Sequence, residues 1–167
     1  MMAAPLDPAC IFRALAEHDV EYVLIGGLAA VLHGSSAMTN DADILPSKDE
    51  DNLRHLSDCL RSLDARIRTP DEPAGVGFDP HPSLLGSVAM LNMTTRCGDL
   101  DLTFSPAALD DYARVRDRAV EFEIYECRVS VAALDDIIRS KEAAARPKDH
   151  ATLPILRALR EELEDRG

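Results

Sequence analysis

YVLIGGLAAVLHGSSAMTNDADIL, residues 22–45, is the stretch that decides the fold. It opens with an apolar run at residues 22–25, which is typical of a buried strand. Gly26-Gly27 follows, where the backbone needs conformational freedom or a close approach to a neighbour. Residues 28–32 predict a short helix, and the stretch ends at Asp41-Ala42-Asp43-Ile44-Leu45 on an extended segment.

Asp41 and Asp43 indicate the chemistry. Residues i and i+2 of a strand point to the same face, and two neighbouring carboxylates repel each other unless a cation neutralises them. Such oxygen ligands suit Mg²⁺, which typically takes one or two carboxylates together with substrate phosphates. The small polar residues Gly34, Ser35 and Ser36 offer backbone N–H groups and hydroxyls that can hold a phosphate. The pattern favours transfer of a phosphoryl or nucleotidyl group from a Mg²⁺-bound nucleoside triphosphate. The alternative for the D-x-D motif alone is a polar turn with two solvated aspartates.

A third carboxylate is expected from GDLDL, residues 98–102. Residues 87–95 and 100–104 predict two strands, and Asp99 and Asp101 share one face by the same period of two. An aspartate in the middle of an apolar strand is unusual. One of the two, Asp99 or Asp101, is therefore expected to complete a second metal position and to act as base for an attacking hydroxyl.

The rest of the chain predicts an α/β (α+β) fold, a mixed sheet flanked by helices with a helical C-terminal end. One domain is expected over 1–167, with a core at about 20–131 and a helical part at about 132–167. Ser47 and Glu50 form a capping-box pattern, and residues 69–83 are a Pro- and Gly-rich loop. The other expected elements are helices at 9–17 (capped by Asp7), 47–63, 106–115, 133–145 and 149–164, and strands at 65–67, 121–127 and 128–131.

Composition limits the possible partners and the compartment. The net charge of −12 is unfavourable for nucleic acid, and aromatic residues make up 4% without a tryptophan, which disfavours a base-stacking platform. No apolar run is long enough to cross a membrane and no leader pattern opens the chain, so we expect no membrane partner and a cytoplasmic location. The four cysteines form no C-x-x-C pair and are expected to be reduced thiols.

Basic residues concentrate near the C-terminus. Residues 138–160 contain six basic side chains, Arg139, Lys141, Arg146, Lys148, Arg157 and Arg160, against the two acidic residues Glu142 and Asp149. This segment is either a solvated helix face or a clamp for triphosphate and polynucleotide.

These motifs resemble the polymerase-β-type nucleotidyltransferase superfamily. The resemblance is carried by Gly26-Gly27, Gly34-Ser35 and Asp41-Ala42-Asp43, with Ala42 where the family usually has a larger aliphatic residue. Residues 98–102 are similar to the family's G-x-L-D-L segment, with Asp101 in the key place. The resemblance implies a nucleotidyltransferase core and catalysis that depends on Mg²⁺ at Asp41, Asp43 and Asp101.

IIRSKEAAARPKD, residues 137–149, resembles a segment of the MenT/AbiE-type toxin nucleotidyltransferases. The resemblance implies that Lys141 lies at the active site and neutralises phosphate charge, and that Asp149 orders this region. Arg146 and Lys148 are then candidates for binding the acceptor. It further implies transfer of nucleotides, with CTP or another pyrimidine favoured, to the tRNA 3′ acceptor end, which blocks aminoacylation and translation until a cognate antitoxin protein restrains the toxin.

Three other functions stay open. A related enzyme modifies a small hydroxylated molecule such as an aminoglycoside, whose positive charge suits an acidic protein. A second alternative modifies a protein, and a third is an inactive, antitoxin-like binding module. Thr39 lies two residues before Asp41 and is a candidate nucleotide-binding residue and regulatory phosphosite, because a phosphate there would repel substrate phosphates.

Overall fold

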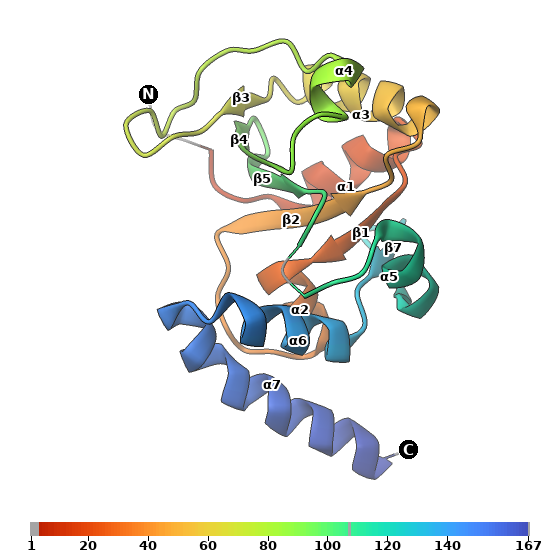
Figure 1. Ribbon diagram of the computed structural model, residues 1–167, viewed down its shortest axis with the longest axis vertical. Helices are drawn as coiled ribbons and strands as arrows, with labels where there is room; N and C mark the ends of the chain where they lie inside the picture. Colours follow the sequence, from red (N-terminus) through yellow and green to blue (C-terminus); the bar gives the residue numbers. More distant parts are fainter. Residues whose placement is uncertain (1–3, 107, 167) are drawn as a thin grey trace.

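A mixed seven-stranded sheet forms the centre of the protein, as the computed structural model, which describes residues 4–106 and 108–166, shows (Figure 1). The strand order is β3-β4-β5-β2-β1-β7-β6. The strands are β1 (Tyr22–Ile25), β2 (Asp41–Pro46), β3 (Arg66–Ile67), β4 (Met90–Thr95), β5 (Gly98–Thr103), β6 (Val120–Ile124) and β7 (Cys127–Val131). The predicted α/β class with a mixed sheet is confirmed.

Helices cover the sheet in two groups. In Figure 1, α1, α3 and α4 lie at the upper end, whereas α2, α6 and α7 lie at the lower end. The helices are α1 (Pro8–Glu17), α2 (Gly26–His33), α3 (Glu50–Ser62), α4 (Pro82–Leu85), α5 (Tyr112–Arg118), α6 (Leu134–Ala144) and α7 (Pro147–Arg166). The structure thus forms the predicted helical C-terminal end.

The strand register brings distant aspartates together. β2 pairs antiparallel with β1 on one side and parallel with β5 on the other. In the second pairing Asp41 lies opposite Asp99, and Asp43 lies opposite Asp101. Because side chains of a strand alternate between faces, all four carboxylates lie on one face of the sheet. The apolar residues between them, Ala42 and Leu100, are fully buried on the other face.

Two local predictions about helix starts have different outcomes. The side chain of Asp7 caps α1 by accepting a hydrogen bond from the Cys10 N–H at 3.2 Å, as predicted. The prediction of a capping box at Ser47 is wrong, because α3 begins two residues later than that pattern requires. Ser47 is instead buried, and its hydroxyl accepts from the Asp49 N–H at 3.3 Å.

The helix predicted at 106–115 is also shifted. Helix α5 begins at Tyr112, where Asp111 accepts a hydrogen bond from the Arg114 N–H at 3.1 Å. A capping aspartate placed later than the proline at 106 therefore decides where this helix starts. Part of the predicted range, residue 107, lies outside the described residues.

Two of the four cysteines are joined. Cys10 on α1 and Cys97 in the turn between β4 and β5 form a disulfide, with Cα atoms 5.7 Å apart, so the prediction of four reduced thiols is wrong for this pair. The pairing was not visible in the sequence because 87 residues separate the two positions. Cys59 and Cys127 are free and buried, as expected.

Reduction of this disulfide is expected to destabilise the protein. The bond closes a long loop, and a native disulfide typically contributes about 2–4 kcal/mol to the free energy of unfolding. Urea unfolding with and without dithiothreitol measures the difference. The double variant Cys10→Ser/Cys97→Ser should unfold at the same urea concentration in both conditions, and a wild-type midpoint insensitive to dithiothreitol would contradict the prediction.

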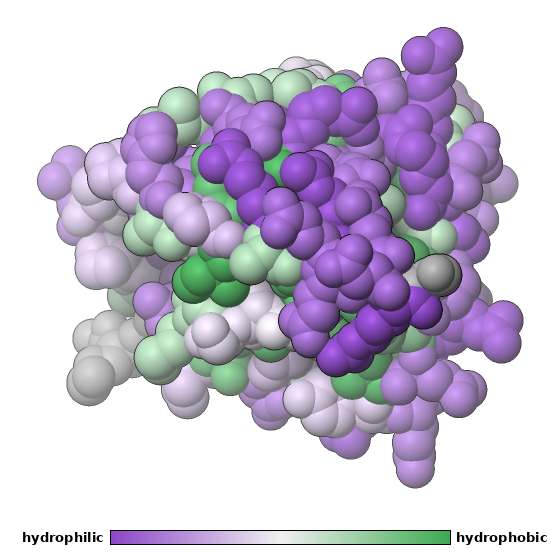
Figure 2. Space-filling view, turned by 90° about the horizontal axis from the view of Figure 1, so that it is seen from below, coloured by the Kyte–Doolittle hydropathy of each residue, from purple (hydrophilic) through white to green (hydrophobic). Residues whose placement is uncertain are grey.

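The surface on the side of α7 is mostly hydrophilic. Figure 2, seen from below relative to Figure 1, shows hydrophilic residues over most of this face with small hydrophobic patches between them. Among the described residues, no helix combines the length and the apolar character that a membrane span requires.

Candidate active site

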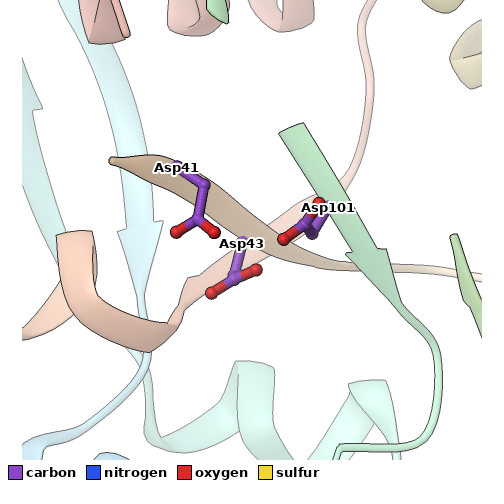
Figure 3. Close-up of side chains that lie close together, drawn as sticks. All are labelled: Asp41, Asp43 and Asp101. Carbon is purple, nitrogen blue, oxygen red and sulfur yellow. The ribbon is translucent and has the colours of Figure 1, made fainter. Parts of the chain in front are cut away.

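Three carboxylates meet on the sheet face. Asp41 and Asp43 project from β2 and Asp101 from the adjacent β5, and their side chains point toward one another (Figure 3). One oxygen of each lies within 4.8 Å of the others. Asp101 is buried, with 8% of its surface exposed, whereas Asp41 and Asp43 are half-buried. Asp101, and not Asp99, joins Asp41 and Asp43 in this group.

Gly26 makes room for this cluster. It has a φ of +73°, and a Cβ atom at this position would lie 2.3 Å from Asp43 Oδ2. Any side chain here would both strain the backbone and displace the carboxylate. The Gly-Gly pair therefore lets the start of α2 approach Asp43 closely.

Two of the three carboxylates, Asp43 and Asp101, hold protons unusually tightly. Burial, with the nearby charges of Asp41 and Asp101, raises the pKa of Asp43 from 3.8 to about 7. Burial also raises the pKa of Asp101 to about 6, although the neighbouring Arg68 opposes that rise. Negative charge is thus concentrated where no cationic side chain fully compensates it.

This donor set fits a divalent cation. Three carboxylates converge, and hard oxygen ligands of this type match Mg²⁺. Asp41, Asp43 and Asp101 would hold the ion, whose charge would offset the repulsion between the three carboxylates.

The stabilising effect of Mg²⁺ is expected to grow with pH. Asp43 and Asp101 have pKa values above that of an unfolded chain. The folded protein therefore keeps protons that the unfolded chain has released, and the metal-free protein loses stability as pH rises from about 4 to about 7. Mg²⁺ competes with these protons and stabilises the folded state by binding it. Melting temperatures with Mg²⁺ and with EDTA should differ more at about pH 8 than at about pH 5.5; an equal difference at both would count against the prediction.

A cavity of about 430 Å³ opens in front of the aspartates. It extends from the sheet to α6 and the start of α7, so that Lys141, Arg146 and Lys148 line it together with Asp41, Asp43 and Asp101. Its wall is partly apolar, through Met90, Pro106 and Leu109. Negative and positive groups thus face one cavity from opposite sides, an arrangement suited to a metal-bound polyphosphate.

Asp149 holds the cationic side of the cavity in place. It is fully buried, and its carboxylate accepts hydrogen bonds from Arg146 Nε at 2.8 Å, from the Arg146 backbone N–H at 3.1 Å and from Lys141 Nζ at 3.5 Å. Burial alone would raise the pKa of Asp149, but the bonds to Arg146 and the charge of Lys141 outweigh it and lower the pKa. Asp149 therefore stays charged and orients two cations toward the cavity.

The Gly34-Ser35-Ser36 segment, predicted to hold phosphate, lies at the end of α2. Gly34 ends α2 with a φ of +117° and packs beside Leu159 of α7. Ser35 is buried, and its hydroxyl accepts from the Ala37 N–H at 3.2 Å. Neither these two residues nor Ser36 is among the described residues that line the cavity.

Thr39 contacts the backbone of Asp41 rather than its carboxylate. Its hydroxyl donates to the carbonyl oxygen of Asp41 at 3.0 Å. A Cβ atom at Gly27 would lie 3.1 Å from this hydroxyl, so Thr39 packs on the Gly-Gly turn. Thr39 is therefore close to the site without lining the cavity.

The basic C-terminal segment is largely paired with acidic residues. Ion pairs join Arg139 to Asp136, Arg157 to Glu142 at 3.1 Å, and Arg160 to Asp135 at 3.4 Å. Asp135 and Asp136 lie just outside the range 138–160 in which the positive charge was counted. Among the described residues, Lys148 is the member of this segment that forms no ion pair. The local positive charge is therefore smaller than the sequence count indicates.

Among the cavity residues that were not predicted, two polar ones lie beside Asp101. Arg68, which follows β3, contacts Asp101, and Asn92 of β4 lies opposite Asp101 in the sheet; both line the cavity. The period of two places Asn92 on the aspartate face only once the β4–β5 register is known. No sequence pattern marks Arg68 as a site residue, because it precedes a long loop and resembles the many charged residues that are expected to be exposed.

No family model matches the sequence, and no curated protein matches it. Solved structures do. The lincosamide antibiotic adenylyltransferase LnuA, bound to lincomycin, is similar over 93% of this chain and 99% of its own, with a TM-score of 0.63 and 13% identity. The antibiotic-resistance factor ANT(2″)-Ia is similar over 93% of this chain and 88% of its own, with a TM-score of 0.55 and 15% identity. The chain therefore has a nucleotidyltransferase fold.

Proposed function

We propose that the protein is a Mg²⁺-dependent nucleotidyltransferase. The single observation that carries the proposal is that one cavity is lined by three carboxylates and two cationic side chains. The carboxylates are Asp41, Asp43 and Asp101, and the cations are Lys141 and Arg146. Carboxylates that bind a cation and side chains that bind phosphate are the two halves of a site for a metal-bound triphosphate.

The proposed reaction transfers a nucleotide to a hydroxyl group. The acceptor oxygen attacks the α-phosphorus, the bond from that phosphorus to the bridging oxygen breaks, and pyrophosphate leaves. A bound Mg²⁺ supplies charge stabilisation for the triphosphate. Asp101, which lies on the strand beside Asp41 and Asp43, takes the proton of the attacking hydroxyl. Lys141 and Arg146, oriented by Asp149, neutralise charge on the leaving pyrophosphate.

The acceptor that we propose first is the 3′ end of tRNA, with a pyrimidine nucleotide such as CTP as donor. The segment that resembles the MenT/AbiE-type toxins, residues 137–149, borders the cavity through Lys141, Arg146 and Lys148. Lys148 forms no ion pair among the described residues and is available to contact an acceptor phosphate. In this proposal the protein is a toxin that blocks aminoacylation, and a cognate antitoxin protein restrains it.

A small hydroxylated molecule is the second candidate acceptor. Two observations favour it: most basic side chains near the C-terminus are already paired with acidic ones, and the net charge of −12 repels a polyanion. LnuA was solved with lincomycin, and ANT(2″)-Ia with adenylyl-2″-tobramycin. A cationic acceptor would suit the acidic surface of this chain.

A panel of acceptors distinguishes between tRNA and a small hydroxylated molecule as the substrate. The purified protein is incubated with Mg²⁺ and each α-labelled nucleoside triphosphate, with total tRNA, an aminoglycoside or a lincosamide. Label in tRNA from one or two nucleotides supports the toxin proposal, whereas label only in an antibiotic supports the second candidate. Binding of Mg²⁺-triphosphate without labelling of any of these would leave the protein-modifying alternative, and absence of any nucleotide or metal binding would support an inactive binding module.

Phosphorylation of Thr39 is proposed as a means of regulation. The hydroxyl lies beside the Gly-Gly turn and the Asp41 backbone, and a phosphate there would add about 1.5–2 negative charges near the triphosphate. The variant Thr39→Glu is expected to lose at least about tenfold in activity relative to Thr39→Val. Equal activity of the two variants would count against the proposal.

A further inference from the structure

The cavity has two unlike halves, one on either side of the aspartates. Lys141, Arg146 and Lys148 line it from α6 and α7. In the sheet, β5 lies between β4 and β2, so β4 lies on the side of β5 that faces away from β2 and β1 (Figure 1). Met90 and Asn92 of β4 line the cavity there. Cationic side chains therefore face one half of the cavity, and uncharged side chains of β4 face the other.

The cations determine from which side an acceptor enters. In nucleotidyl transfer the attacking and leaving oxygens lie roughly in line at the phosphorus atom. Lys141 and Arg146 attract the triphosphate and its leaving pyrophosphate, so the attacking hydroxyl comes from the half of the cavity beside β4. Arg68 also lines this half, but its guanidinium nitrogens are already paired with Asp99 Oδ2 at 3.3 Å and Asp101 Oδ1 at 3.2 Å. This half therefore suits an uncharged part of the acceptor.

Asn92 lies beside the carboxylate that takes the proton. It is opposite Asp101 in the β4–β5 pairing, and opposite residues of antiparallel strands share a face with Cβ atoms about 4.5–5.5 Å apart. Its backbone is fixed by this pairing and by the Arg68 N–H, which donates to the Asn92 carbonyl oxygen at 2.9 Å. The side chain is exposed and has no hydrogen-bond partner among residues 4–106 and 108–166. Its amide is therefore held in place, open to the cavity and unused.

Met90 supplies an apolar surface next to this amide. It lies two residues before Asn92 on the same face of β4, opposite Thr103 of β5, and 57% of it is exposed although it is apolar. Thr103 lines the cavity as well. A sugar ring has the matching chemistry, since its hydroxyls form a polar edge and its C–H groups form an apolar face. The amide group of Asn92 can both donate to and accept from a polar group on such a ring.

We propose that Asn92 determines acceptor specificity by binding the polar group next to the reacting hydroxyl, so that the acceptor is a sugar ring with two adjacent polar groups. Asp101 takes the proton of one hydroxyl, and the amide at the opposite strand position binds its neighbour. The inference rests on the proposed function, which supplies the reaction and the role of Asp101. It names a chemistry that the terminal ribose of tRNA and the sugars of antibiotics share.

Acceptors with and without the neighbouring group test the inference. Each acceptor of the panel is compared with an analogue that lacks the polar group beside the labelled oxygen: tRNA ending in a 2′-deoxynucleoside, or the corresponding derivative of lincomycin or tobramycin. Wild type is expected to prefer the complete acceptor about tenfold in kcat/KM, the usual effect of one hydrogen bond. Asn92→Ala should use both about equally, with an unchanged KM for the triphosphate. The arm that becomes labelled shows which source provides the sugar.

Three further variants make the result specific. Asn92→Gln keeps the amide and should keep a preference for the complete acceptor. Asn40→Ala is the matched control, because Asn40 is also exposed but is not among the described residues that line the cavity; it should keep the full preference. Asn92→Leu fills the space without a polar group and replaces Asn92→Ala if that variant does not fold, as circular dichroism shows.

The outcomes separate this inference from the proposed function. A preference that is absent from wild type, retained in Asn92→Ala or Asn92→Leu, or lost in Asn40→Ala would overturn the role of Asn92 while nucleotidyl transfer stands. A triphosphate KM that rises as much as the acceptor KM would overturn it too. Binding of Mg²⁺-triphosphate without label in any sugar-containing acceptor would overturn the inference alone. Absence of Mg²⁺-triphosphate binding would overturn the proposed function, and the inference with it.

Discussion

Replacement of Asp43 by asparagine is expected to lower the rate of nucleotidyl transfer by about 10³-fold, the loss typical when one group that stabilises transition-state charge is removed. Asp43 lies at the centre of the aspartate cluster, between Asp41 on its own strand and Asp101 on the next. Asparagine has nearly the same shape but carries no charge, so the change isolates electrostatics from packing. The measurement is transfer of label from an α-labelled triphosphate to whichever acceptor of the panel above becomes labelled.

The same substitution should affect stability in the opposite direction. Because burial and the neighbouring charges of Asp41 and Asp101 raise the pKa of Asp43, removing its charge is expected to raise the melting temperature of the metal-free protein above pH 7. Mg²⁺ should then stabilise the variant less than wild type. The matched control is Asp58→Asn, an exposed carboxylate of α3 that pairs with Arg61 at 3.6 Å. An Asp43→Asn variant as active as this control would refute the assigned role of Asp43.

Replacement of Asp149 by alanine is expected to lower the free energy of unfolding by about 3–5 kcal/mol, the range measured when one partner of a buried ion pair is removed. Asp149 is fully buried and compensates both Lys141 and Arg146. Its loss would leave these cations facing each other at the junction of α6 and α7. Activity should fall as well, since both cations would lose their fixed orientation toward the cavity.

Glu142→Ala is the control for this prediction. Glu142 also pairs with an arginine of α7, Arg157, at 3.1 Å, but about half of each side chain is exposed. An exposed pair typically contributes about 0–1 kcal/mol. Urea unfolding curves should therefore separate the two variants clearly, and an equally small effect of both would contradict the structural role of Asp149.

Short-range patterns in the sequence predicted the centre of the fold. The apolar run at 22–25, the Gly-Gly pair and the two aspartates each express a local rule, so the strand, the short helix and the shared face of Asp41 and Asp43 could be read directly. The alternation in residues 98–102 placed Asp99 and Asp101 on one face. Choosing Asp101 from the residues alone was harder, because a strand pattern does not reveal which neighbour lies opposite Asp43.

The features that were missed depend on contacts between distant residues. The disulfide joins Cys10 to Cys97, and Arg68 meets Asp101 across 33 positions, so neither leaves a local pattern. The charge count for residues 138–160 was misleading for the same reason, because Arg139 and Arg160 pair with Asp136 and Asp135 just outside the range. The Gly34-Ser35 pair was predicted to bind phosphate; in the structure Gly34 ends α2, and neither residue is among the described residues that line the cavity.

The fate of the α- and γ-phosphates of the nucleoside triphosphate tests the central claim most directly. The protein is incubated with Mg²⁺, the acceptor panel and a nucleoside triphosphate labelled at the α- or the γ-phosphate. Nucleotidyl transfer at Asp41, Asp43 and Asp101 predicts that the α label enters the acceptor while the γ label is released in pyrophosphate, and that Asp43→Asn slows both by about 10³-fold. Entry of the γ label into the acceptor, or equal turnover by Asp43→Asn, would contradict the account.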